Sequence, residues 1–136
     1  KDNGKEKLYS DKHILVVEDS EKNRKFAREL LQKTGAGIDT AGNGQEAVKM
    51  FSDSEEGYYD LVLMDIQMPV MDGNEATKKI RALERKDAKV VPIVAMTTYL
   101  FAEDIRSLFR AGMDMHIAKP LSDQKLTDVM KKYFTR

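Results

Sequence analysis

The chain has 136 residues, which is enough for one globular domain and too few for two domains of ordinary size. Hydrophobic residues make up 41% and charged residues 34% of the sequence, a balance that excludes a fully disordered protein. Because 23 Lys and Arg residues offset 23 Asp and Glu residues, no net charge draws the chain to nucleic acid or to an anionic membrane. We therefore expect no direct nucleic-acid partner.

The sequence contains no cysteine, which excludes disulfides, thiolate metal sites and thiol nucleophiles. Its uninterrupted apolar stretches reach only about five residues, far below the ~20 that span a bilayer, so we expect no membrane span here. Residues 1–11 are polar and carry no apolar block of the signal-peptide type. We predict a polar N-terminal extension or linker over residues 1–11, one domain over residues 12–136, and a cytoplasmic location.

Short apolar runs alternate along the chain with longer segments of helical spacing, which is typical of repeating strand and helix units. The first run, 14–17, precedes a helix whose buried face contains Phe26 and which stops at Gly35. The second run, 38–41, alternates apolar and polar residues like an edge strand. The helix after it begins at Asn43, a residue type that caps helix N-termini.

Three further apolar runs cover residues 61–64, 90–96 and 115–118. A helix is expected after each of them, because apolar residues recur there at spacings of three and four. The expected buried residues of these three helices are Ala76, Ile80 and Leu83, then Ile105, Leu108 and Phe109, and finally Leu126, Val129 and Met130. The last helix begins at Ser122.

Parallel strands require right-handed crossovers, so these units predict a doubly wound α/β fold. We expect a five-stranded parallel sheet of flavodoxin-like order 2-1-3-4-5 with five helices. In such sheets, ligands bind beyond the carboxyl ends of the strands, at the point where the strand order reverses.

Polar side chains follow four of the five predicted strands. Glu18 and Asp19 follow the first strand, Asp65 the third, Thr97 the fourth and Lys119 the last. Three carboxylates that converge exceed the charge of one lysine, and Mg²⁺ is a hard cation that accepts a sparse set of oxygen ligands. The sequence therefore predicts an acidic Mg²⁺ site.

A carboxylate beside Mg²⁺ can attack a phosphoryl group, because the metal and an ammonium screen the approaching negative charges. Asp65 is the candidate nucleophile, Thr97 can donate a hydroxyl hydrogen to a phosphoryl oxygen, and Lys119 can pair with another oxygen. Each residue taken singly is common at strand ends as a turn residue or a surface charge. Their occurrence together favours a phosphoryl site.

These residues resemble the receiver domain of two-component response regulators over about 12–133, nearly the whole chain. The resemblance is carried by Val-Val-Glu-Asp-Ser at 16–20, Met-Asp-Ile-Gln-Met-Pro-Val-Met-Asp-Gly at 64–73, Ala-Met-Thr at 95–97 and Ala-Lys-Pro at 118–120. The second segment, with Gly-Met-Asp at 112–114, looks most like the receivers of hybrid sensor histidine kinases.

The resemblance implies that Asp65 takes a phosphoryl group from a phosphohistidine on a histidine kinase or a histidine phosphotransfer domain. It also implies that Glu18, Asp19, Asp65 and the backbone carbonyl of Gln67 hold Mg²⁺. Thr97 and Lys119 would then contact the phosphoryl group, and the peptide bond after Lys119 would be cis.

The family also implies a partner surface on the fourth helix, the last strand and the last helix that responds to phosphorylation. Tyr99, Leu100, Phe101 and Phe109 are unusually apolar for a surface segment, and we weigh such a role about evenly against ordinary burial.

Two positions depart from the family pattern. His116 occupies the switch position three residues before Lys119, where the family has an aromatic ring that turns inward together with Thr97. An imidazole is smaller and more polar than that ring, so we expect a smaller gain from the inward rotamer. Thr98 stands where a small Ala is usual.

Two other functions remain as alternatives. An aspartyl-phosphate hydrolase would form the same intermediate, but it needs a second acid two residues after the nucleophile, where this chain has Gln67. A pseudo-receiver that serves only as a scaffold is disfavoured by the intact acidic set. No Walker-type loop is present, so ATP is not expected to be the direct donor.

Overall fold

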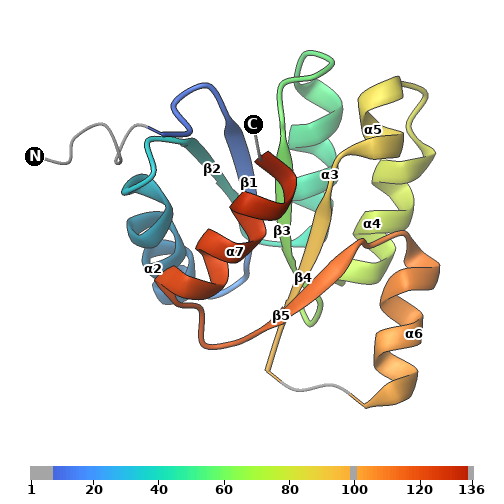
Figure 1. Cartoon of the computed structure of the whole chain (residues 1–136). Coiled ribbons are helices and arrows are strands. Elements are labelled where there is room, and N and C mark those ends of the chain that lie inside the picture. Colours follow the sequence, from blue (N-terminus) through green and yellow to red (C-terminus); the bar gives the residue numbers. More distant parts are fainter. Residues whose placement is uncertain (1–7, 99–100, 135–136) are drawn as a thin grey trace, which may run out of the picture.

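The computed structural model describes residues 8–98 and 101–134 (Figure 1). Its five strands are parallel and form one sheet in the order β2-β1-β3-β4-β5, which confirms the predicted flavodoxin-like topology. The strands are β1 His13–Val17, β2 Gly37–Ala41, β3 Leu61–Asp65, β4 Ile93–Thr97 and β5 Met115–Ala118. The helices are α2 Glu21–Gln32, α3 Gly44–Asp53, α4 Gly73–Ala82, α5 Lys86–Val90, α6 Ala102–Ala111 and α7 Asp123–Phe134.

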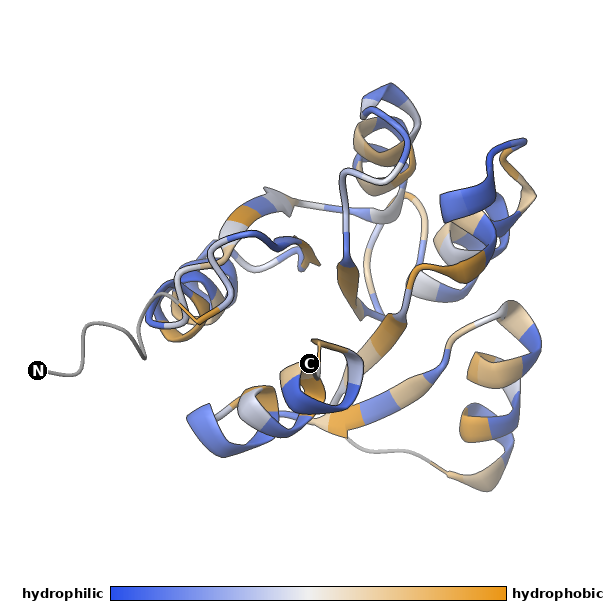
Figure 2. Cartoon of the chain, turned by 45° about the horizontal axis from the view of Figure 1, so that its top comes forward, coloured by the Kyte–Doolittle hydropathy of each residue, from blue (hydrophilic) through white to orange (hydrophobic). Residues whose placement is uncertain are grey.

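Helices cover both faces of the sheet, and each face has its own apolar core. Ile14 and Val16 of β1 face the core formed with α2 and α7. Leu15 and Val17 face the opposite core, formed with α3, α4 and α6. This division follows from the alternation of side chains along a strand, and it explains why β1 is apolar at successive positions. In Figure 2 the hydrophobic colour gathers on the strands, whereas the surrounding helices mix hydrophobic and hydrophilic residues.

The described residues form one more helix than the five predicted, because the short helix α5 lies between α4 and β4. The predicted strand over 90–96 is therefore too long: Val90 ends α5 and is 75% exposed, and β4 begins only at Ile93. Pro92 separates the two elements and has no N–H to donate to a ladder. Arg85 fixes α5 by donating hydrogen bonds to the carbonyl oxygens of Phe51 and Ser54 and to the Asp87 carboxylate.

The start and end signals of the helices are confirmed in part. Asn43 caps α3, and its side chain accepts a hydrogen bond from the Glu46 N–H at 2.8 Å. Gly35 adopts a positive φ of 89°, but α2 already ends at Gln32. Phe26 was expected on the buried face of α2 and is instead 44% exposed, so that helix buries a narrower stripe than predicted.

Tyr9 belongs to the core beside α2 and α7, although it lies in the segment that we predicted as an extension or linker. Its ring meets that of Phe134 edge to face, with the centroids 5.4 Å apart, and its N–H donates to the carbonyl oxygen of Thr34. Part of that segment therefore packs against the domain, and the boundary at residue 12 stays a prediction. None of the helices in the described parts of the chain combines the length and hydropathy that crossing a bilayer requires.

Gly73 allows α4 to begin directly against the end of β3. A Cβ atom at this position would lie 2.4 Å from the carbonyl oxygen of Asp65 and 2.8 Å from the Cα of Ile66, both of which are backbone atoms. Gly73→Ala is therefore expected to lower the free energy of unfolding by about 1–3 kcal/mol, as measured by urea denaturation.

Gly42→Ala is the matched control for this substitution. A Cβ at Gly42 would meet only the far ends of two flexible side chains, those of Arg24 at 3.3 Å and of Glu46 at 3.4 Å. Equal losses of unfolding free energy in the two variants would contradict the expected clash between α4 and β3.

Candidate active site

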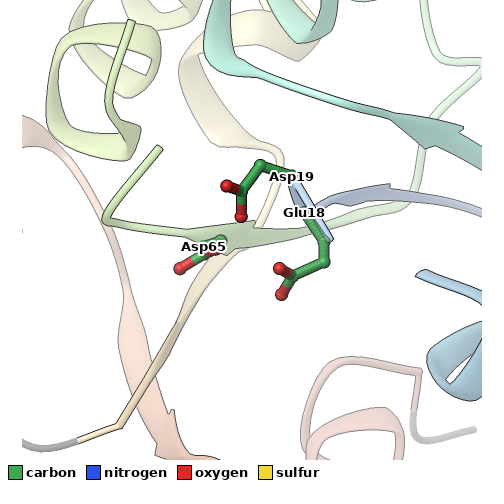
Figure 3. A group of neighbouring side chains, drawn as sticks. All are labelled: Glu18, Asp19 and Asp65. Carbon is green, nitrogen blue, oxygen red and sulfur yellow. The ribbon is translucent and has the colours of Figure 1, made fainter. Parts of the chain in front are cut away.

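The polar residues singled out at the strand ends lie together at the carboxyl edge of the sheet. Glu18 and Asp19 follow β1, and Asp65 is the last residue of the neighbouring strand β3. One carboxylate oxygen from each of these three residues lies within 4.8 Å of the other two. Figure 3 shows the three side chains side by side at this edge of the sheet. Lys119 approaches from the end of β5, with its Nζ 2.7 Å from Glu18 Oε1 and 3.5 Å from Asp65 Oδ2.

The acidic groups differ in exposure. Glu18 and Asp65 are only 3% and 5% exposed, whereas Asp19 is open to solvent. The Glu18 carboxylate also accepts a hydrogen bond from the Ser20 N–H at 3.1 Å. Arg24 donates to the Glu18 carbonyl oxygen at 2.7 Å and so ties α2 to the loop that carries both acids.

The pKa values of the two buried carboxylates shift in opposite directions. Burial and the neighbouring charge of Glu18 raise the pKa of Asp65 to about 6, although Lys119 acts in the opposite direction. Burial also acts to raise the pKa of Glu18, but the hydrogen bonds from Lys119 and the Ser20 N–H outweigh it and lower that pKa. The ammonium of Lys119 thus favours ionised Glu18, and of the two buried carboxylates Asp65 has the less compensated charge.

The donor set fits a hard divalent cation. Two buried carboxylates and one exposed carboxylate offer oxygen ligands around one point, which is the chemistry that Mg²⁺ prefers. Lys119 supplies a single positive charge against three negative ones, and a divalent ion would balance the remainder. Within residues 8–98 and 101–134, no other group of three acidic or histidine side chains comes this close.

The other predicted site residues lie around this acidic group. Thr97 ends β4 and is 6% exposed, and its carbonyl oxygen accepts a hydrogen bond from the Lys119 N–H at 2.7 Å. The Gln67 side chain is exposed, and its N–H donates to Asp65 Oδ1 at 3.3 Å. His116 lies on β5, three residues before Lys119, and is half-buried, with its ring centroid 6.5 Å from that of Phe109. The peptide bond between Lys119 and Pro120 is cis, as the resemblance implied.

An apolar cavity of about 230 Å³ opens beside the acidic group, and sequence reasoning did not anticipate it. It lies between α2 and the chain that follows β5, and its lining includes Phe26, Met96, Lys119 and Pro120. The signal in the sequence was Phe26 itself, which fits the apolar spacing of α2 but faces this cavity instead of the core.

The comparisons with known proteins agree with this geometry. The family model for the response regulator receiver domain matches residues 14–131. The chain belongs to this family. A curated relative, two-component response regulator ORR41 of Oryza sativa subsp. japonica, is 43% identical over 88% of this chain and 92% of its own length.

Other relatives of this receiver domain are long histidine kinases. Sensor protein GacS of Pseudomonas syringae pv. syringae is 39% identical over 88% of this chain, which spans 13% of that protein. Probable histidine kinase 1 of Oryza sativa subsp. indica is 34% identical, and the chain spans 15% of its length.

Solved structures confirm the receiver fold. The receiver domain of sensor histidine kinase PA1611 from Pseudomonas aeruginosa PAO1 superposes with a TM-score of 0.81 and 31% identity, covering 92% of this chain and 98% of that one. That structure has a magnesium ion coordinated in its active-site cleft. The chemotaxis protein CheY4 of Vibrio cholerae gives a TM-score of 0.82 at 27% identity, over 90% of this chain and 98% of that one.

Proposed function

We propose that this receiver domain takes a phosphoryl group from a phosphohistidine onto Asp65, with Mg²⁺ held by Glu18, Asp19, Asp65 and the backbone carbonyl of Gln67. The observation that carries the proposal is the meeting of three carboxylates within 4.8 Å, with Lys119 beside them. The donor would be a histidine kinase or a histidine phosphotransfer domain.

Each residue has a defined task in the transfer. A carboxylate oxygen of Asp65 attacks phosphorus and forms the new O–P bond, while the N–P bond of the donor breaks and its electron pair returns to the imidazole nitrogen. Lys119 pairs with one phosphoryl oxygen as a point charge, and the Thr97 hydroxyl donates to another. Bound Mg²⁺ would supply neutralising charge to the carboxylates and the incoming phosphoryl group.

Incubation with acetyl phosphate and Mg²⁺ separates this function from its two alternatives, when intact mass and free phosphate are followed together. A stable adduct of one phosphoryl group supports the receiver function. Rapid release of phosphate without an adduct would indicate the aspartyl-phosphate hydrolase, although Gln67 cannot act there as a carboxylic acid. The absence of any reaction would indicate a pseudo-receiver scaffold.

The phosphohistidine donor has an apolar surface to contact beside the site. Phe26 is 44% exposed and lines the cavity next to Lys119 and Pro120. Phe26→Ala is expected to slow transfer from a phosphorylated phosphotransfer domain on the order of tenfold, because buried aromatic anchors dominate protein interfaces. Phosphorylation by acetyl phosphate should keep its rate, since that donor is too small to need the surface.

Tyr58→Ala is the matched control, because Tyr58 is a comparably exposed aromatic residue (37%) that stacks on His13 at the start of β1, away from the carboxyl edge of the sheet. Loss of the acetyl phosphate reaction in Phe26→Ala, or equal slowing in both variants, would contradict a donor surface at α2.

A second surface, on α6, β5 and α7, is proposed to respond to phosphorylation and bind a protein partner. Phe101 and Phe109 are 67% and 46% exposed, so two of the apolar residues singled out there are on the surface. Tyr99 and Leu100 lie outside the described residues. The partner role remains a proposal.

Thr97 and His116 are proposed to switch this surface, and we expect His116 to change less than a tyrosine would. Its ring already lies against Phe109 and is half-buried. Imidazole chemical shifts recorded with and without beryllofluoride should therefore show partial populations of two ring orientations. A complete, pH-independent flip on adding beryllofluoride would contradict this expectation.

We propose that this receiver domain is part of a hybrid sensor histidine kinase and that it lies in the cytoplasm. The motif over 64–73 supports this origin, and long histidine kinases are among the relatives. A stand-alone regulator is the alternative that ORR41 represents.

A further inference from the structure

The main chain around Lys119 leaves the sheet at an open edge. The Lys119 N–H donates to the Thr97 carbonyl oxygen of β4 at 2.7 Å. Because a trans peptide points its N–H and C=O in opposite directions, the carbonyl of Ala118 faces away from β4. On that side β5 has no neighbouring strand among residues 8–98 and 101–134, so the sheet itself provides no donor for this carbonyl.

Lys125 provides that donor from the first turn of α7. Its Nζ donates to the carbonyl oxygen of Ala118 at 2.9 Å and to that of Pro120 at 2.9 Å. The two acceptors flank Lys119 on either side. The Lys125 N–H in turn donates to Ser122 Oγ at 3.2 Å, which anchors the turn that carries the ammonium.

We propose that Lys125 is a positioning residue for phosphoryl transfer, which fixes the main chain on both sides of Lys119 and so sets where the Lys119 ammonium lies. This inference rests on the proposed function of Asp65 as phosphoacceptor. An ammonium has three donors, and two of them are used here on the backbone of one short loop.

The reason for precise placement lies in the two partners of Lys119. Its Nζ lies 2.7 Å from the Glu18 carboxylate and 3.5 Å from the Asp65 carboxylate. When Asp65 is phosphorylated, the ammonium must therefore shift away from Glu18 and toward the phosphoryl group on Asp65. A loop that drifts by about an ångström would leave the ammonium out of reach of the phosphoryl oxygen, and misplacement of this size can slow a reaction by up to a hundredfold.

The test compares Lys125→Met with wild type under saturating Mg²⁺, following the phosphoryl adduct by intact mass at several acetyl phosphate concentrations. Methionine retains an unbranched side chain but cannot donate a hydrogen bond. We expect the maximal rate of phosphorylation to fall on the order of tenfold, with the Mg²⁺ affinity unchanged because Lys125 contacts no carboxylate of the site. Lys125→Arg should restore most of the rate, since a guanidinium can donate to both carbonyls.

Lys33→Met is the matched control. Lys33 pairs with Asp123 in the same turn of α7, and both side chains are more than half exposed. This variant removes the same charge near the same turn without touching the loop, and its phosphorylation rate should equal that of wild type.

A double variant distinguishes positioning from general weakening of the fold. In a Lys119→Met background, Lys125→Met should cause no further slowing, because the side chain that it positions is already gone. Full additivity of the two substitutions, or a wild-type rate in Lys125→Met alone, would overturn the inference while leaving the proposed function intact. A wild-type protein that acquires no phosphoryl group would overturn both.

Discussion

Asp65→Asn is expected to abolish the phosphoryl adduct and, in the metal-free protein at pH 7, to raise the free energy of unfolding on the order of 2 kcal/mol. The loss of phosphorylation and the gain in stability have one cause. Burial and the charge of Glu18 raise the pKa of Asp65 to about 6, so its ionised form opposes folding when no cation is bound. The amide removes that cost together with the nucleophile.

The same pKa fixes the direction of the pH dependence. Unfolded Asp65 loses its proton near 3.8 and folded Asp65 near 6, so between these values the folded state holds more protons. The unfolding free energy of metal-free wild type should therefore fall, relative to Asp65→Asn, as pH rises from about 4 to about 6, and the difference should stay constant above that.

Urea denaturation in the presence of a chelator at several pH values measures this difference. Adding Mg²⁺ at pH 7 should then stabilise wild type more than Asp65→Asn, because the ion binds the folded state. Parallel stability curves for the two proteins across pH 4–7 would contradict an uncompensated charge on Asp65.

Asp19→Asn is expected to weaken Mg²⁺ binding at least tenfold and to slow phosphorylation accordingly at limiting Mg²⁺, because one of three charged ligands becomes neutral. Asp19 is the exposed member of the acidic group, so the substitution should leave the unfolding free energy of the metal-free protein within about 0.5 kcal/mol of wild type. Isothermal titration with MgCl₂ measures the affinity directly.

Glu21→Gln provides the control for Asp19→Asn. Glu21 is an exposed acid in the first turn of α2, two residues further along the chain, and lies outside the acidic group. If both variants weakened Mg²⁺ binding equally, the effect would come from general negative charge at this edge and not from ligation by Asp19.

The strands were predictable because a strand that is buried on both faces of the sheet has apolar residues at successive positions. Runs such as Leu61 to Met64 are apolar at every position, which is typical of a short parallel strand covered on both faces. The helix α5 was not predictable in this way, because it is five residues long and is held by Arg85 reaching carbonyls more than thirty residues away. Phe26 shows the same limit: helical spacing places it on the apolar stripe of α2, but only the tertiary fold shows that its ring faces a cavity and not the core.

The candidate site was predictable where the topology alone decides it. Asp65 and Lys119 stand directly at strand ends, and the order of a doubly wound sheet brings such ends together. The sequence could not predict that the Lys119 ammonium lies closer to Glu18 than to Asp65. The two Nζ–carboxylate distances differ by less than an ångström. The hydrogen bonds of Lys125 to the loop were missed for a related reason, because a lysine on a helix normally indicates only a solvated surface.

Locating the phosphoryl group is the most direct test of the account. After reaction with acetyl phosphate and Mg²⁺, reduction by borohydride converts an aspartyl phosphate to homoserine, which peptide mass mapping assigns to one position. We predict homoserine at position 65, and its absence when Mg²⁺ is chelated. Homoserine at any other aspartate, or an unmodified Asp65 in a protein that carries the phosphoryl group, would contradict the account.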